Sequence, residues 1–230
     1  MRLFERVGLQ VEKKQERVRG RVGFRAGVET LEGRAVLSAS GANIFLSYGM
    51  VGVVGTNLGD TGSVSLQGNL VHVKVSNAQG SDDVAFPAAD VNSVYFKGGS
   101  GSNTFSNDTS LTGYLYGGSG NNVLNAGAGT DYLIARGQGT EVLNAGSGSA
   151  VLQATGTGTH YLNGGTGSTT MIVTAGTNYL QGGSGTNTIA TYGGQNTING
   201  GSGDTYVFSF VSTDVITPAS GRQSVYRIGY

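Results

Sequence analysis

Cysteine is absent from the 230 residues, which excludes disulfide bonds, thiolate metal sites and cysteine nucleophiles. Charged residues make up only 12% of the chain and aromatic residues 8%, whereas glycine takes 42 positions. A compact globular core contains less glycine and more large apolar side chains than this. The composition therefore favours a repetitive β architecture.

Long apolar runs are also absent. No stretch approaches the ~18 consecutive apolar residues that a membrane-spanning helix needs. The nearest candidate for the apolar part of a secretory signal, VGFRAGV, is interrupted by Arg25. We therefore expect no membrane span, and the N-terminus by itself does not establish export.

The net charge of zero conceals an excess of positive charge at one end. Residues 1–34 hold nine of the fourteen Lys and Arg residues, together with five Glu. Within ERVGLQVEKKQERVRGR the two signs alternate and no aromatic residues are interleaved for stacking, so nucleic-acid binding is not expected. We predict that residues 1–38 form a basic leader that is disordered or weakly helical.

Residues 41–97 consist of short β-branched runs that are divided by turn signals such as NLGD and NAQGSDD. In LVHVKV, three valines alternate with His72 and Lys74, which is the period of a half-buried strand. We predict β-strands here that serve as N-terminal coils or as a cap. Residues 209–230 are predicted to form C-terminal cap strands.

Residues 98–208 form an internal repeat of nine or ten residues. Units such as GGSGSNTFS, GGSGNNVLN, AGAGTDYLI and GGSGTNTIA begin with a glycine-rich turn and continue into a short strand. One apolar position recurs twelve times and is predicted to form the core: Phe105, Leu115, Leu124, Leu133, Leu143, Leu152, Leu162, Met171, Leu180, Ile189, Ile198 and Val207.

These units resemble the G-G-x-G-x-D-x-U-x nonapeptide of the repeats-in-toxin (RTX) family, the haemolysin-type calcium-binding repeats. The resemblance implies an all-β fold, a right-handed parallel β-roll or β-solenoid in which two nonapeptides make one coil of about 18–19 residues. Separately, VETLEGRAVLSAS at residues 28–40 is similar to a leader motif of planctomycete surface or exported proteins. Together the two resemblances imply an extracellular or cell-surface protein.

Alternate units are expected to lie on two separate sheets, with successive coils in register. On the first sheet, the outward residue after the core position is an amide in five of six coils: Ser106, Asn125, Asn144, Asn163, Gln181 and Asn199. Amides in register hydrogen-bond along a stack, so a ladder is predicted. On the second sheet the outward residues are more apolar, and this predicts an interaction face of Tyr114, Tyr116, Tyr132, Ile134, Ile172 and Tyr206.

The sixth position of each unit bears on calcium, because the family's aspartate stands there. On the first side it holds Asn103, Asn122, Glu141, His160, Asn178 and Asn196, and on the other Gly113, Asp131, Ala150, Thr169, Asn187 and Thr205. Each side thus has one carboxylate, and calcium affinity depends on how many ligands are charged. Asp131, Glu141, Asn122 and Asn103 are therefore candidates for weak calcium binding only, and no cofactor is expected to be required. The amides are predicted to pair with one another instead.

Catalytic chemistry is not indicated by the sequence. Glu141 and His160 occupy equivalent positions in adjacent coils, but no third ligand or nucleophile accompanies them, and a solvated pair at a turn edge is expected. The repeat zone has only five charged residues and no clustered set of the kind that a polysaccharide-processing enzyme needs.

The sequence therefore predicts a non-enzymatic, exported or cell-surface structural or adhesive β-solenoid. Its interaction face is expected to meet a surface matrix, a protein partner or a second copy of the chain. The alternative is a genuine calcium-binding RTX module that folds when it is secreted into millimolar calcium.

Overall fold

The computed structural model describes residues 34–36 and 38–229. The chain divides into two units, residues 1–30 and 31–230, and the second unit contains every described element. The predicted leader over residues 1–38 lies almost entirely outside the described residues, and so does most of the leader motif at 28–40.

The second unit consists of two β-sheets and a single 3-10 turn, η1 (Ala88–Asp90), among the residues that the structure describes. The first sheet has ten strands, in the order β20 (Val215–Thr217), β18 (Gln195–Asn199), β16 (Thr177–Gln181), β14 (Thr159–Asn163), β12 (Thr140–Asn144), β10 (Asn122–Asn125), β8 (Asn103–Asp108), β4 (Thr61–Gln67), β5 (Leu70–Asn77) and β6 (Gly80–Pro87). The second has eleven, in the order β1 (Arg34–Val36), β2 (Asn43–Ser47), β3 (Met50–Val54), β7 (Ser93–Lys97), β9 (Thr112–Tyr116), β11 (Thr130–Ala135), β13 (Ser149–Ala154), β15 (Thr169–Val173), β17 (Asn187–Thr191), β19 (Thr205–Ser209) and β21 (Gln223–Arg227).

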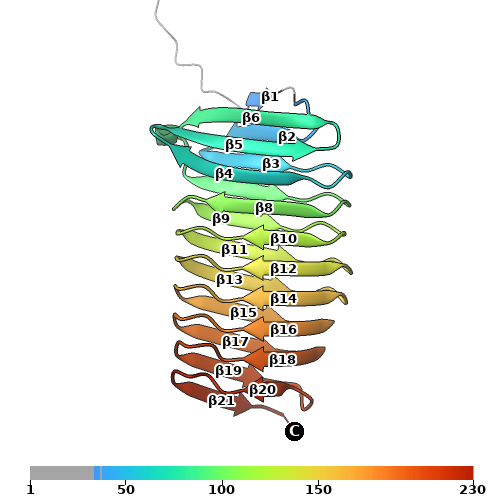
Figure 1. Ribbon diagram of the computed structural model, residues 1–230, viewed down its shortest axis with the longest axis vertical. Coiled ribbons are helices and arrows are strands. Elements are labelled where there is room, and N and C mark those ends of the chain that lie inside the picture. The colour runs from blue at the N-terminus through green and yellow to red at the C-terminus, as the bar shows by residue number, and fades with distance from the viewer. Residues whose placement is uncertain (1–33, 37, 230) are drawn as a thin grey trace, which may run out of the picture. The chain divides into compact units, whose positions relative to one another are not determined.

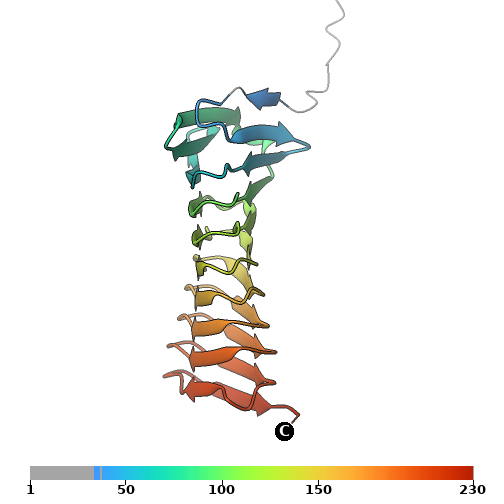
Figure 2. The ribbon, with the colours of Figure 1, turned by 90° about the vertical axis from the view of Figure 1, so that its right-hand side faces the viewer.

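From β7 onward the chain alternates between the two sheets, and every strand pairs in parallel with the strand two places along the chain (Figure 1). The two sheets face one another across the core (Figure 2). On the ten-stranded sheet, the step between register partners is nineteen residues from β8 to β14 and eighteen residues from β14 to β20. This confirms the predicted all-β parallel solenoid.

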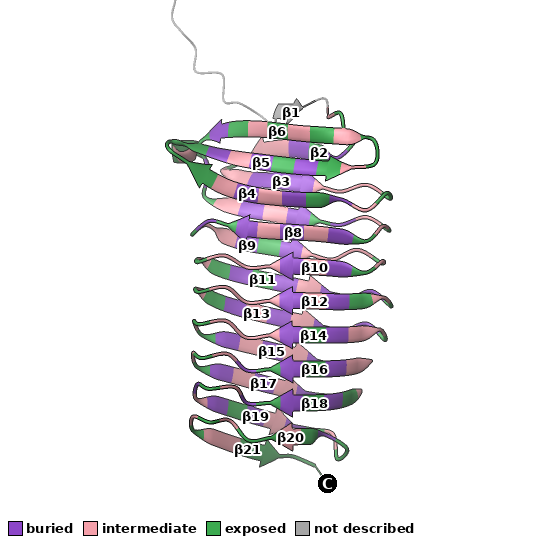
Figure 3. Ribbon diagram, in the orientation of Figure 1, coloured by how far each residue is buried: buried purple, intermediate pink, exposed green. Residues whose placement is uncertain are grey.

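The repeated apolar position is the core of the solenoid. Leu124, Leu143 and Leu162 are direct register partners on β10, β12 and β14, and each is fully buried. All twelve predicted core residues are buried, and buried and accessible residues alternate along the strands (Figure 3). One coil cannot bury its own apolar face, so the stacking of neighbouring coils stabilises each one.

Antiparallel strands occupy the N-terminal end of both sheets. β1, β2 and β3 form one antiparallel set, and β4, β5 and β6 form another, while β3 and β4 pair in parallel with β7 and β8. The predicted alternation in LVHVKV is confirmed, because Val71, Val73 and Val75 are buried on β5. At the other end, β20 and β21 pair in parallel with β18 and β19 and extend both sheets.

The predicted amide ladder forms on the outer surface of the ten-stranded sheet. Asn125 Nδ2 donates to Ser106 Oγ (2.9 Å), Asn144 Nδ2 to Asn125 Oδ1 (2.7 Å) and Asn163 Nδ2 to Asn144 Oδ1 (2.7 Å). The ladder ends there, because Gln181 Nε2 donates to Gly182 O instead.

Candidate calcium site and exposed face

The sixth positions of the ten-stranded sheet form a buried line of polar side chains, here called the interior file. Its repeat members are at most 3% exposed and are direct register partners in successive coils: Asn103, Asn122, Glu141, His160, Asn178 and Asn196. The expectation that Glu141 and His160 are solvated at a turn edge is therefore wrong. Each residue stands two places before a core residue, and the period of two turns both side chains inward.

Hydrogen bonds join the first three members of the interior file. Asn103 Nδ2 donates to Asn122 Oδ1 (2.8 Å), and Asn122 Nδ2 donates to Glu141 Oε1 (2.9 Å). The series ends at Glu141, because an ionised carboxylate accepts hydrogen bonds and has no proton to donate to the next coil. The predicted direct pairing of amides is confirmed.

A second set of hydrogen bonds begins at His160. Its Nδ1 lies 2.8 Å from Asn178 Oδ1, and because that oxygen only accepts, Nδ1 carries the proton. Asn178 Nδ2 then donates to Asn196 Oδ1 (2.7 Å), and Asn196 Nδ2 donates to Asp214 Oδ1 (2.7 Å). This set also ends on a carboxylate.

Sequence reasoning missed two further members of the interior file, Asp60 and Asp214. The backbone N–H of Asp60 donates to Asn103 Oδ1, and Asp214 closes the far end. Asp214 stands eighteen residues after Asn196, so the repeat spacing contained the signal for it. Asp60 is separated from Asn103 by the antiparallel strands β5 and β6, which interrupt the spacing.

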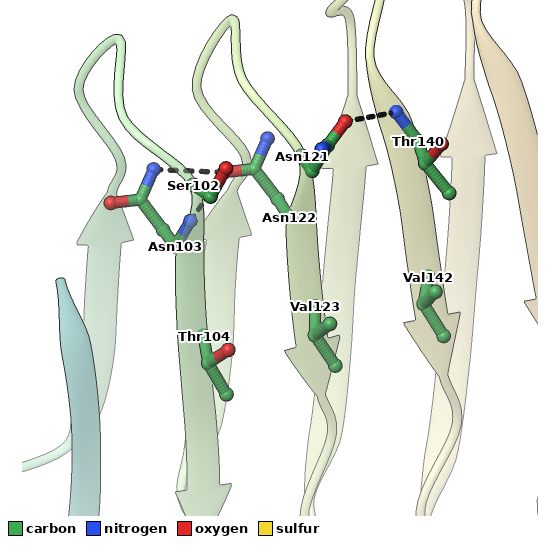
Figure 4. A pocket seen from close by; sticks show the side chains of 8 residues that line it. All are labelled: Ser102, Asn103, Thr104, Asn121, Asn122, Val123, Thr140 and Val142. Carbon is green, nitrogen blue, oxygen red and sulfur yellow. Dashed lines mark hydrogen bonds between the residues drawn. The ribbon is translucent and has the colours of Figure 1, made fainter. Parts of the chain in front are cut away.

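The amide groups also occupy the turn carbonyls next to the file. Asn122 Nδ2 lies 3.2 Å from Gly118 O and 2.9 Å from Gly120 O, and Asn103 Nδ2 lies 2.8 Å from Gly101 O. Figure 4 shows Asn103 and Asn122 together beside a shallow hollow of about 360 Å³. Calcium binds carbonyl oxygens of this kind in proteins. Here the partly positive amide nitrogens of Asn103 and Asn122 contact these oxygens, in the place that a cation would take.

Asp131 lies apart from the other candidates, on β11 of the eleven-stranded sheet. Its Oδ1 accepts from Asn107 Nδ2 (2.7 Å) and its Oδ2 from the Gly127 N–H (3.0 Å). Burial raises the pKa of the Asp131 carboxyl, and these hydrogen bonds lower it in part. Its register partners are Gly113 and Ala150, which have no side-chain oxygen to share a cation.

The space for the Asp131 carboxylate depends on glycine at position 113. A Cβ atom on Gly113 would lie only 2.1 Å from Asp131 Oδ1. The absence of a side chain there lets the carboxylate reach back toward Asn107 of the preceding coil.

Glu141 is the candidate with a free ligand atom. Burial raises the pKa of its carboxyl to about 7, and the hydrogen bond from Asn122 offsets part of this rise in the pKa. Its Oε2 and the Nε2 of His160 are both buried and have no hydrogen-bond partner within the described chain. In residues 34–36 and 38–229 no group of three or more His, Cys, Asp or Glu side chains is placed to hold a metal ion.

The outer surface of the eleven-stranded sheet carries the predicted interaction face. Tyr114 and Tyr132 stack with their ring centroids 5.3 Å apart, and each is 37% exposed, while Tyr206 is 41% exposed. Tyr116, Ile134 and Ile172 are half-buried on the same surface. Residues 41–97 extend both sheets at the N-terminal end of the stack. No helix of the described part of the chain has the length and apolarity that a membrane span requires.

Comparison with protein families links these coils to a known repeat. The model of the RTX calcium-binding nonapeptide repeat matches residues 112–138 and 172–207. These two segments carry RTX repeats, in four copies. Between the two matched segments lie residues 139–171, which contain Glu141 and His160 and keep the same parallel register as the RTX coils on either side. Comparison with curated proteins found no match, and comparison with solved structures found none either.

Proposed function

We propose that this RTX β-roll keeps its fold without calcium and serves as an exported or cell-surface structural and adhesive protein. The observation that carries the first part is the amide occupancy of the turn carbonyls. Asn103 and Asn122 donate both to the carbonyl oxygens of their own turns and to the next member of the interior file. Each amide thereby supplies the cross-coil link that an ion would otherwise provide.

Calcium binding in this proposal is weak, and it centres on Asn103, Asn122 and Glu141. Only Glu141 contributes a negative charge among them, and charged ligands set calcium affinity. Asp131 is a second weak candidate on the opposite sheet, where its oxygens already accept two hydrogen bonds. No cofactor is required for the coils to stack.

The exported location is supported by the family, since RTX repeat proteins are typically secreted or surface-exposed. The adhesive role is supported by the interaction face, where apolar and tyrosine side chains gather on the outside of one sheet. A partner on this face is a surface matrix, another protein or a second copy of the chain. The proposed role is structural, in keeping with the general character of RTX repeat solenoids.

The calcium proposal is tested by thermal unfolding of the full chain, followed by far-UV circular dichroism in a chelator and in millimolar calcium. We expect the wild-type spectrum and midpoint to be nearly the same in both. The double variant Asn103→Asp, Asn122→Asp places carboxylates at positions 103, 122 and 141 in succession, next to the carboxylate of Asp60. It is expected to be strongly destabilised in the chelator, by about 3 kcal/mol or more for buried unpaired charge, and to recover in calcium.

The matched control is Asn125→Asp, which makes the same kind of change on the half-buried surface ladder and is expected to gain little from calcium. A wild-type chain that is largely unfolded in the chelator and folds on addition of calcium would contradict the proposal. That outcome would instead identify a calcium-binding RTX module that folds on secretion.

A further inference from the structure

A pair of stacked tyrosines lies on the outer surface of the ten-stranded sheet, on the opposite side from the interaction face. Tyr161 and Tyr179 are register partners on β14 and β16. Their ring centroids are 5.0 Å apart, their planes differ by 11°, and they are 40% and 42% exposed. The faces of the two rings therefore point along the direction in which the coils stack.

The aromatic column stops at the next coil. The register partner of Tyr179 on β18 is Thr197, a small exposed residue. One face of the Tyr179 ring is covered by Tyr161, and the opposite face looks toward Thr197. A hollow of about 170 Å³ lies at this step, lined by both tyrosines, Thr197 and the neighbouring amide column.

The amides beside the hollow are those that follow the end of the surface ladder. Gln181 Nε2 donates to Gly182 O, and Asn199 Oδ1 accepts from the Gly201 N–H. Within the described residues, no hydrogen bond joins Asn163, Gln181 and Asn199 to one another. These exposed amides offer donors and acceptors to a ligand at the edge of the aromatic ring.

The lining of the hollow contains no charged side chain. An anionic ligand such as a nucleic acid or a polyuronate would find no cation here, so the site suits a neutral ligand. A ligand that fits has one flat apolar face for Tyr179 and hydroxyl groups at its rim for the amides. A pyranose ring presents both, with axial C–H groups on its face and hydroxyls around its edge.

We propose that the hollow between Tyr179 and Thr197 binds a sugar ring of a neutral polysaccharide. The sugar takes the position of the next ring in the aromatic column and receives hydrogen bonds from Gln181 and Asn199. This site goes beyond the proposed function, because it uses the other sheet and depends neither on calcium nor on the interaction face.

The test is retardation of the folded full chain in native gels that contain a β-1,4-glucan, a β-1,3-glucan or a β-1,4-mannan, with polygalacturonate as the anionic comparison. We expect retardation by at least one of the three neutral polymers and none by polygalacturonate. Tyr179→Ala removes the stacking surface and should weaken binding about tenfold, the effect of losing an aromatic contact of this size. Tyr179→Phe should retain binding.

Thr197→Tyr is the sharper variant. It continues the tyrosine column by one step, which the sheet already accepts at Tyr161 and Tyr179, and it fills the hollow. We expect this variant to unfold like the wild type and to lose retardation. Tyr192→Ala, which removes an exposed ring stacked on Phe210 outside both proposed sites, should behave as the wild type. Equal retardation of Thr197→Tyr and the wild type would overturn the proposal. So would the absence of retardation by all three neutral polymers, or binding to polygalacturonate alone.

Discussion

Glu141 illustrates at the residue scale why a carboxylate stands inside a line of amides. Every other repeat member of the interior file donates a hydrogen bond to the next coil, and such a series needs a member that only accepts. Glu141 ends the first series and Asp214 ends the second. The residue that looks like a remnant of calcium binding thus has a use in a roll without the ion.

The protonation of Glu141 leads to a prediction about pH. Its pKa in the folded chain is raised by burial to about 7, from an ordinary value of 4.5, so the folded state holds the proton more tightly than the unfolded state. The resulting stabilisation is fully present below pH 4.5 and is lost as the pH rises through 7. Between these values we expect the free energy of unfolding to fall by up to about 1.4 kcal/mol per pH unit.

Urea unfolding across this range measures the effect. Glu141→Gln cannot titrate and should flatten this part of the profile, while Asp90→Asn, a change at an exposed carboxylate, should leave it as in the wild type. A Glu141→Gln chain with the same slope as the wild type would show that the buried carboxyl is not responsible.

At the scale of elements, side-chain hydrogen bonds join β8 to β10 and β10 to β12 on both faces of the sheet, and β12 to β14 on its outer face. The surface ladder runs over Ser106, Asn125, Asn144 and Asn163, and the interior file lies on the same strands with its side chains turned the other way. Each pair of neighbouring strands therefore has side-chain hydrogen bonds on one or both faces, in addition to the backbone ladder. These bonds favour one register over any alternative.

Asn144 is the member of the ladder at which the contribution of these bonds is best measured. It donates to Asn125 and accepts from Asn163, so Asn144→Ala removes two hydrogen bonds at once. We expect a loss of about 1–3 kcal/mol, at roughly 1 kcal/mol for each bond. The measurement is the midpoint of urea unfolding at unchanged slope. Asn199→Ala, beyond the end of the ladder, is the control and should cost less than half as much.

At the scale of the whole folded unit, the two sheets present different outer surfaces. One carries the interaction face, and we predict that the triple variant Tyr132→Ser, Ile134→Ser, Ile172→Ser lowers self-association and adhesion to a surface matrix. Removal of apolar contact area from an exposed patch weakens whatever binds there. Light scattering after size-exclusion chromatography and a pull-down against matrix material measure the two effects.

The double variant Val123→Ser, Val142→Ser serves as the control for this test, because it makes the same kind of change on the outer surface of the other sheet. If the triple variant keeps the oligomeric state and the binding of the wild type, the interaction face has no adhesive role.

The spacing of the repeats predicted the fold because a solenoid is specified locally and then repeated. Once the apolar position recurs at nine or ten residues, the sheets, the core and the vertical partners of residues such as Leu143 follow from the coil length. The surface ladder was predictable for the same reason.

The interior file was harder to predict. The family pattern directs attention to the sixth position as a ligand at a turn, whereas the burial of Glu141 and His160 follows from strand periodicity. The separation of Asp131 from Glu141 onto different sheets was predictable from the alternation of units. The occupancy of Gly118 O and Gly120 O by Asn122 depends on side-chain rotamers, which the spacing does not contain.

The two lines of amides run in opposite senses through the same coils. In the interior file each donor points toward the C-terminal neighbour, and in the surface ladder each donor points toward the N-terminal neighbour. A single line of aligned amides would add up its dipoles as a helix does and would place opposite partial charges at the two ends of the stack. Between β8 and β12, where both lines are present, the two opposed lines offset one another in part.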